Sequence, residues 1–69
     1  MRLSARNIIK GKILEVKRGA TTAHAKIDVG GGTVITSSIT NEAVDELDLK
    51  AGDPAYAVIK ASDVIVAKD

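Results

Sequence analysis

Three consecutive glycines, Gly30-Gly31-Gly32, constrain the fold most strongly because they separate two runs that each resemble a β-strand. Before them, residues 23–29 (AHAKIDV) alternate apolar and polar side chains with the period of a half-buried strand. After them, residues 33–39 (TVITSSI) are rich in β-branched side chains. Two such runs joined by glycines predict a β-hairpin. A phosphate-binding loop is the alternative, but no Gly-Lys-Ser/Thr follows and the next element is a strand.

The remaining elements follow from periodicity and from turn residues. Gly11 lies inside the first predicted strand, where a glycine indicates a bulge or a close backbone approach, as at the bend of a small barrel. Thr40 is the expected N-cap of a short helix, and the glycine and proline of residues 50–54 predict the turn after it. The predicted elements are strands over 8–17, 55–61 and 64–67 and a helix over 40–47, in addition to the hairpin.

This order of elements predicts an all-β fold with one short helix, in which three strands, a helix and two strands follow one another. A five-stranded barrel with a helix between strands three and four is the oligonucleotide/oligosaccharide-binding (OB) architecture. No repeat or linker divides residues 1–69, so a single domain is expected.

The composition indicates that the chain assembles with copies of itself. A chain of 69 residues buries only about 60% of its unfolded surface, so its stability as a monomer is expected to be marginal. It has no cysteine for a disulfide, and its one histidine, His24, cannot form a metal cluster alone. Tyr56 is its only aromatic residue, so Val, Ile and Ala form a thin core. Oligomerisation is the remaining common stabilising device.

Charge and motifs argue against several functions. No Cys nucleophile, second histidine or carboxylate pair suited to catalysis is present, so no enzymatic activity is expected. A net charge of +1 and a single aromatic residue are poor for a nucleic-acid-binding surface, although an OB-like nucleic-acid or protein-interaction module remains the alternative function. No signal peptide or membrane span is recognised, which predicts a cytoplasmic protein with no membrane partner.

A site for a small anion requires only a few hydrogen-bond donors and one or two cations, and the sequence offers such groups at three places. Ser4, Arg6 and Asn7 carry a hydroxyl, a guanidinium and an amide, which suit a tetrahedral oxyanion. Thr40 begins a helix whose third position is Ala43, so the helix start lacks the carboxylate of a capping box and could accept an external anion. The alternative is that Thr40 is an ordinary N-cap with no ligand. Lys60 and Ser62 follow the fourth predicted strand.

These motifs together resemble the molbindins, the Mop-type molybdate-binding proteins with a TOBE-like domain. The resemblance covers essentially the whole chain. It is carried by the following segments: Ser4-Ala5-Arg6-Asn7 before a strand with Gly11, Ile39-Thr40 opening a short helix, Leu49-Lys50-Ala51-Gly52-Asp53, and residues 58–64 (VIKASDV).

The resemblance implies a five-stranded OB-like barrel that assembles as a homohexamer, a trimer of dimers, with molybdate or tungstate bound between subunits. Ser4, Ala5 and Arg6 of one subunit would face Thr40, Ala43 and Lys60 of a neighbour, with Ala5 and Ala43 contributing backbone N–H groups. Ser62 and Lys60 are candidates for a second class of site near the symmetry axes. The expected function is storage or homeostasis of molybdenum in the cell. A purely structural oligomer is a further alternative.

Overall fold

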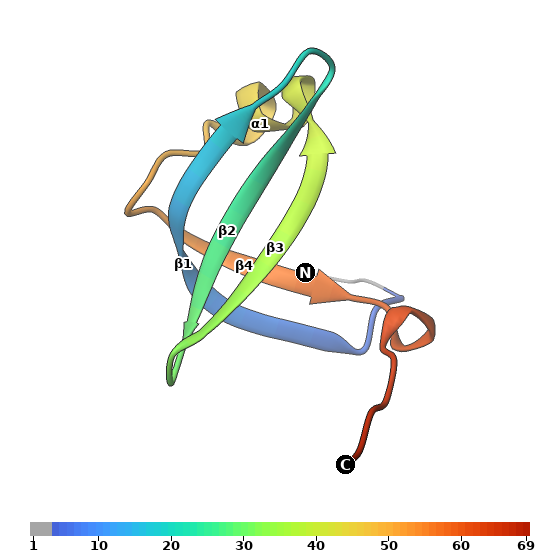
Figure 1. Ribbon diagram of the computed structural model, residues 1–69. Helices are drawn as coiled ribbons and strands as arrows, with labels where there is room; N and C mark the ends of the chain where they lie inside the picture. Colours follow the sequence, from blue (N-terminus) through green and yellow to red (C-terminus); the bar gives the residue numbers. More distant parts are fainter. Residues whose placement is uncertain (1–3) are drawn as a thin grey trace.

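The computed structural model describes residues 4–69, which form four strands, one α-helix and one 3₁₀-helix (Figure 1). In chain order the elements are β1 (Asn7–Arg18), β2 (Thr22–Gly30), β3 (Thr33–Thr40), α1 (Asn41–Leu47), β4 (Pro54–Ile59) and the 3₁₀-helix η1 (Ala61–Asp63). The predictions of four strands and of the helix between β3 and β4 are therefore confirmed to within two residues at most boundaries.

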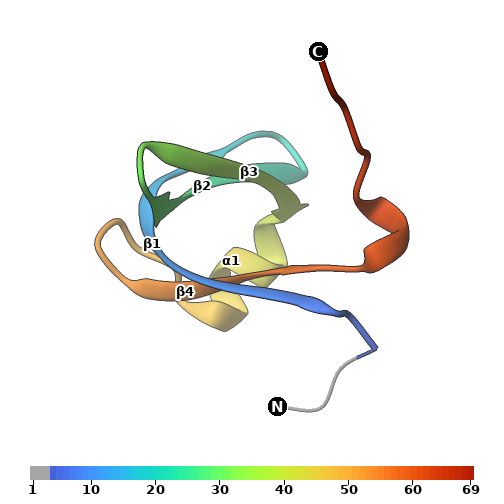
Figure 2. The ribbon, with the colours of Figure 1, turned by 90° about the horizontal axis from the view of Figure 1, so that it is seen from below.

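All four strands belong to one antiparallel sheet with the order β3-β2-β1-β4. The 12-residue β1 has two partners, one for each half of its length. Its first half, Asn7–Lys12, pairs with β4, and its second half, Lys12–Arg18, pairs with β2. Figures 1 and 2 show that β1 bends strongly between the two halves. β1 therefore carries the chain from one side of the fold to the other.

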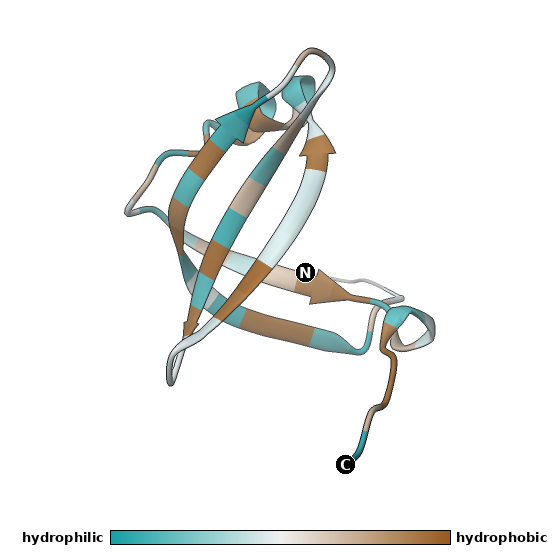
Figure 3. Ribbon diagram, viewed as in Figure 1, coloured by the Kyte–Doolittle hydropathy of each residue, from teal (hydrophilic) through white to brown (hydrophobic). Residues whose placement is uncertain are grey.

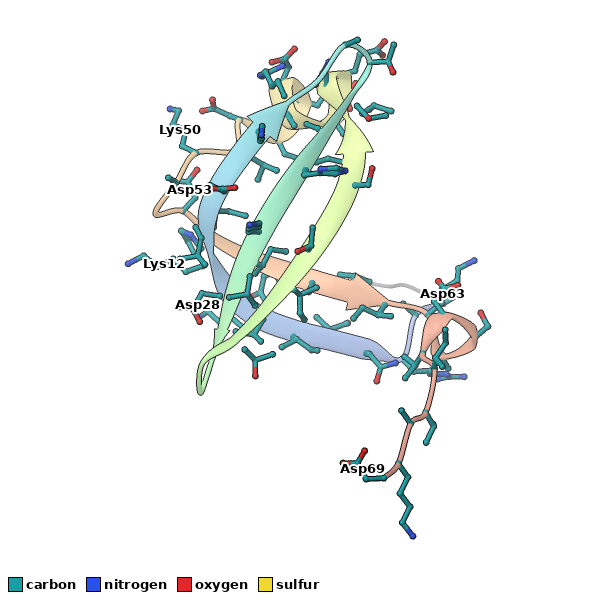
Figure 4. All side chains as sticks on the ribbon, viewed as in Figure 1. Lys12, Asp28, Lys50, Asp53, Asp63 and Asp69 are labelled. Carbon is teal, nitrogen blue, oxygen red and sulfur yellow. The ribbon has the colours of Figure 1, made fainter. Side chains whose placement is uncertain are left out.

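Gly11 lies at this bend, in close contact with β2. A Cβ atom added to Gly11 would lie 2.6 Å from the Asp28 carbonyl oxygen and 2.7 Å from Ile27 Cγ2. The neighbouring Lys12 is paired with both Asp28 and Pro54, so the two halves of the sheet meet at this point (Figure 4). The prediction of a close backbone approach at Gly11 is confirmed, whereas the irregularity in the β1–β2 pairing lies further on, between Ile13 and Glu15.

The hairpin predicted at the three glycines joins β2 to β3. Gly31 and Gly32 form its turn with φ of 62° and 81°, the left-handed values that two-residue hairpin turns require. The Gly30 N–H donates to Asp28 Oδ1 at 2.9 Å, which fixes the entry to the turn. Residues with φ above zero are rarely other than glycine, so the glycine cluster serves this turn.

The core is small and consists of short or β-branched side chains. Its buried members are Ile13, Ala23, Ala25, Ile27, Val44 and Ala57. The alternation predicted for β2 is confirmed, since Ala23, Ala25 and Ile27 are its buried side chains. On α1 only Val44 is buried, whereas Leu47, the last residue of the helix, is 65% exposed. The chain thus encloses little apolar volume by itself.

The predicted fifth strand is wrong for the single chain, and the sheet is not closed into a barrel. Residues 64–67 follow η1 without a strand partner in the described part of the chain. Residue 61, predicted as the end of the fourth strand, instead begins η1. Because η1 turns the chain away from β4, the segment after it projects from the sheet in Figures 1 and 2. β3 and β4 remain as two unpaired edges.

We expect Gly11→Ala to lower the free energy of unfolding by about 1–3 kcal/mol, because the added methyl group overlaps backbone that cannot move without displacing β2. At an unstrained position the same substitution is stabilising by about 0.4–1 kcal/mol. Urea unfolding followed by circular dichroism measures the difference. Lys10→Ala, at an exposed position on the same strand, is the control and should change stability by no more than about 0.5 kcal/mol. An increase in stability for Gly11→Ala would contradict the crowding.

Candidate functional site

The first candidate site lies where the start of β1 meets the end of β4, and we call it the β1–β4 end (residues 4–7 and 60–62). Asn7 is paired with Ile59, and its side-chain Nδ2 donates to the Ile59 carbonyl oxygen at 3.1 Å. Arg6 and Lys60 are the next residues along the chain, just outside the two paired strands. The side-chain amide of Asn7 was predicted to donate a hydrogen bond to an anion. In this structure it joins the ends of β1 and β4, next to Arg6 and Lys60 in the sequence.

Arg6 and Lys60 place two positive charges on adjacent strand ends. Directly opposed like charges are destabilising, because their side chains share one face. Both residues are exposed, and within residues 4–69 neither forms an ion pair. Asp63 is the nearest acidic residue along the chain, on η1 (Figure 4), and it forms no ion pair with Lys60. An anion between Arg6 and Lys60 would relieve their repulsion.

Hydroxyl and backbone donors flank this pair of cations. Ser4 lies two residues before Arg6 and Ser62 two residues after Lys60, and both serines are exposed. Ala5 is half-buried between Ser4 and Arg6 in an irregular segment, so its backbone N–H is not committed to a strand ladder. Six of the eight predicted site residues therefore belong to the β1–β4 end. Asn7 links its two strands, and the other five are Ser4, Ala5, Arg6, Lys60 and Ser62.

The second candidate site is the start of α1. Thr40 is the N-cap, with φ of −72° and ψ of 153°, and its Oγ1 accepts a hydrogen bond from the Ala43 N–H at 3.0 Å. Thr40 was correctly predicted as the cap. The cap uses the Ala43 N–H that was expected to face the anion, but it leaves the Thr40 hydroxyl hydrogen available as a donor. Ala43 therefore orients the Thr40 hydroxyl in the single chain.

Two residues that the sequence analysis did not single out as site residues hold the helix start in place. Asn41 donates from its backbone N–H to the Thr21 carbonyl at 3.2 Å and from Nδ2 to the Gly19 carbonyl at 3.1 Å. Arg18 forms an ion pair with Asp45 on α1. The turn between β1 and β2 is thereby joined to α1. No local sequence signal reveals these contacts, because the partners are 20 to 27 residues apart in the chain.

The two candidate sites lie far apart within one chain. Asn7, beside the first site, is the first residue of β1, and Arg18, beside the second, is the last. A strand extends about 3.3 Å per residue, so the length of β1 separates the sites even though it bends. Lys60 follows the end of β4, beside the start of β1, whereas Thr40 and Ala43 lie at the start of α1.

Two other features are absent from the part of the chain that the structure describes. Within residues 4–69, no three His, Cys, Asp or Glu side chains gather as metal ligands. No helix in this range has the length and apolar composition needed to cross a membrane. The structure thus defines a small, mostly β protein in which the predicted site residues lie at two separate places.

Comparison with known proteins agrees with this description. Residues 3–66 match the TOBE domain family. A probable molybdenum-pterin-binding protein from Haemophilus influenzae is 47% identical over 66 residues, which cover 96% of each chain. The chain therefore belongs to the TOBE domain family and, within it, to the Mop-type molybdenum-pterin-binding proteins.

Solved structures extend the likeness to the fold. A molybdate-binding protein from Sporomusa ovata superposes with a TM-score of 0.92 and 34% identity, covering 99% of this chain and all of that one. The cytoplasmic molybdate-binding protein ModG, with molybdate bound, superposes with a TM-score of 0.89 and 54% identity. This match covers 94% of the present chain and 46% of ModG. The neighbours thus share the fold along nearly the whole chain.

We expect Thr40→Ala to lower the free energy of unfolding by about 1 kcal/mol, because the Ala43 N–H loses its acceptor. Thr40→Ser keeps the hydroxyl and should retain most of the stability. Urea unfolding of the three proteins measures the effect. Equal losses for both variants would show that packing of the threonine methyl group, and not the cap, is responsible.

Proposed function

We propose that this protein binds molybdate or tungstate at contacts between its own subunits and acts as a store or buffer of molybdenum in the cytoplasm. The observation that supports the proposal is the pairing of Asn7 with Ile59, which brings together the strand ends next to Arg6 and Lys60; within residues 4–69 these two cations form no ion pair. Membership of a family whose members are named for molybdenum supports the choice of oxyanion.

The chemistry of the β1–β4 end suits a tetrahedral dianion. Arg6 offers a planar guanidinium with several N–H donors, and Lys60 offers a compact ammonium with three. Charge-assisted hydrogen bonds of this kind are about twice as strong as neutral ones. Ser4, Ser62 and the Ala5 N–H add uncharged donors around the same point. The ligand supplies the negative charge that the pair of cations lacks.

A site between subunits follows from the separation of the two candidate sites. We infer that the β1–β4 end of one subunit, with Ser4, Ala5, Arg6, Lys60 and Ser62, meets the helix start of another. Thr40 of the second subunit would then donate its hydroxyl hydrogen, held in place by the Ala43 N–H. This arrangement keeps the residues expected from the resemblance and moves Lys60 to the subunit that carries Arg6. A homohexamer, a trimer of dimers, would repeat the contact.

The aromatic content favours a free oxyanion over a pterin. Flat heterocycles are commonly bound by stacking on aromatic side chains. Tyr56 is the only aromatic residue, and it lies on β4 within an apolar groove, away from the charged end of that strand. The charged groups at the β1–β4 end therefore recognise the oxyanion itself. Discrimination against sulfate would depend on the spacing of the donors, because sulfate has the same charge and shape.

A role in storage, without catalysis, fits the groups present. The proposed site holds cations and hydroxyl groups but no general base, and its donors bind the ligand without activating a bond. ModG is named as a cytoplasmic molybdate-binding protein, which supports the same compartment here. Release of the anion would accompany any loosening of the contact between subunits, since binding and assembly stabilise each other.

We expect isothermal titration to show binding of molybdate and tungstate and markedly weaker binding of sulfate. Arg6→Ala and Lys60→Ala should each weaken molybdate binding by about 10-fold to 100-fold, since hydrogen bonds to charged groups contribute about 1.5–3 kcal/mol. No heat with molybdate and tungstate, or equal affinity for all three anions, would contradict the proposal.

Lys26→Ala is the matched control for these titrations. It removes the same charge from an exposed position in the middle of β2, where Lys26 lies 3.7 Å from Glu15 Oε1. Surface ion pairs of this kind contribute little to stability. Molybdate affinity should therefore be unchanged in this variant. A loss equal to that of Arg6→Ala would mean that net charge, and not the β1–β4 end, determines binding.

The division of the site between subunits can be tested by mixing. Arg6→Ala and Thr40→Ala subunits should each bind molybdate poorly when pure. After dissociation and reassembly together, some contacts combine an intact β1–β4 end with an intact helix start, so part of the binding capacity should return in the titration. No recovery in assemblies shown by mass measurement to contain both variants would exclude a site shared by these two ends.

A further inference from the structure

The chain has two asparagines, and each directly follows a residue of the proposed anion site. Asn7 follows Arg6, and Asn41 follows Thr40. Asn7 Nδ2 donates to the main-chain carbonyl of the last residue of β4, and Asn41 Nδ2 donates to a main-chain carbonyl in the turn between β1 and β2. Both hydrogen bonds are 3.1 Å long, and their partners lie 52 and 22 residues away along the chain. The two halves of the proposed site therefore have the same kind of support.

Asn7 joins the two strand ends from which Arg6 and Lys60 continue. It is paired with Ile59 in the sheet, and its side chain adds a second connection between the same two residues. Figure 3 shows hydrophilic residues at the start of β1 and just beyond the end of β4, where the pairing stops. Strand ends open easily, because no further ladder hydrogen bonds hold them. The Asn7 amide thus fixes the separation of the two main chains at the point where the cationic residues begin.

Asn41 holds the start of α1 against the turn between β1 and β2. Its backbone N–H donates to the Thr21 carbonyl at 3.2 Å, and its side chain donates to the Gly19 carbonyl. Its Oδ1 is buried and accepts no hydrogen bond within residues 4–69. A buried acceptor without a partner lowers what the residue contributes to stability. Stability alone therefore gives little reason for an asparagine at this position, whereas a fixed placement of the neighbouring Thr40 does.

The position of the main chain decides where the short donors of the proposed site lie. Ser4 and Thr40 carry their hydroxyl groups on Cβ, and Ala5 would donate from its backbone N–H. Such groups cannot adjust to a ligand of another size, whereas the long side chains of Arg6 and Lys60 can. Molybdate and sulfate are both tetrahedral dianions, and molybdate is the larger. Short donors on a rigid main chain can distinguish the two anions, and the same donors on a loose main chain cannot.

We propose that Asn7 and Asn41 are positioning residues that determine the selectivity for molybdate over sulfate without being ligands of the anion. Asn7 fixes the β1–β4 end and Asn41 fixes the helix start, each through a hydrogen bond to a main-chain carbonyl. This inference rests on the proposed function, and it gives the Asn7 amide a different role from the anion donor predicted from the sequence.

Isothermal titration of Asn7→Ala and Asn41→Ala tests the proposal, with the affinity for sulfate measured by its displacement of bound molybdate. The ratio of molybdate affinity to sulfate affinity should fall by about 3-fold to 10-fold in each variant, the effect of one misplaced hydrogen bond. Molybdate binding weakens in this case, and sulfate binding changes little. If the amides were ligands, both affinities would fall together. A ratio equal to that of the unmodified protein in both variants would overturn the proposal.

Asn41→Asp removes the same hydrogen bond in a variant that should fold well. An acidic side chain is favourable in the first turn of a helix, and Arg18 Nη1 already donates to the Asn41 carbonyl at 3.5 Å. A carboxylate cannot donate to the Gly19 carbonyl. The added negative charge acts on both dianions alike, so the affinity ratio still reports on the spacing of the donors. It should fall as in Asn41→Ala, and an unchanged ratio would contradict the role given to Asn41.

Asp28→Ala is the matched control, because it removes a hydrogen bond between a side chain and the main chain outside the proposed site. Asp28 Oδ1 accepts this bond from the Gly30 N–H at 2.9 Å, in the hairpin between β2 and β3. Thr40 is paired with Thr22, at the opposite end of β2. The control should lose stability in urea unfolding but keep the affinity ratio. An equal fall in the ratio would mean that lost stability, and not lost positioning, reduces selectivity, and would overturn the proposal.

The same titrations separate this inference from the proposed function. An unmodified protein that binds neither anion would contradict the proposed function and this inference with it. Molybdate binding by the unmodified protein, with the same affinity ratio in all the asparagine variants, would contradict only this inference.

Discussion

The close approach of β1 to β2 at Gly11 is the constraint on which the rest of this structure depends. Only a residue without a Cβ atom allows the Asp28 carbonyl to lie where it does. Because β1 bends there, its first half can pair with β4 and its second half with β2. This double pairing holds the charged residues of the β1–β4 end together and keeps them a strand's length away from the helix start.

The same geometry leaves the single chain incomplete in two respects. The pair formed by Arg6 and Lys60 has excess positive charge, and the gap between β3 and β4 has unpaired edges and apolar walls. An oxyanion is the partner that we propose for the two cations. A thin core of alanine and β-branched side chains explains why contacts between subunits would be useful to a protein of this size.

Local patterns predicted most of the fold, because they reflect interactions between residues close in sequence. The glycine hairpin, the Thr40 cap and the alternation of β2 depend on backbone conformation and side-chain period alone. The fifth strand could not be located in the same way. Its sequence favours a strand, but formation of a strand requires a partner edge, and η1 turns the segment away from the edges of its own chain.

The sequence alone determined the types of residue at the candidate site, namely Ser4, Ala5, Arg6, Thr40, Lys60 and Ser62, because tetrahedral anions require donors and cations of these kinds. Their grouping was decided only by the tertiary structure. The pairing of Asn7 with Ile59 brings together the strand ends that precede Lys60 and follow Arg6 and gives Asn7 a structural role, whereas Thr40 lies at the start of α1. Asn7 and Ile59 are 52 residues apart in the sequence, and no local pattern of side chains specifies that two such distant strands pair.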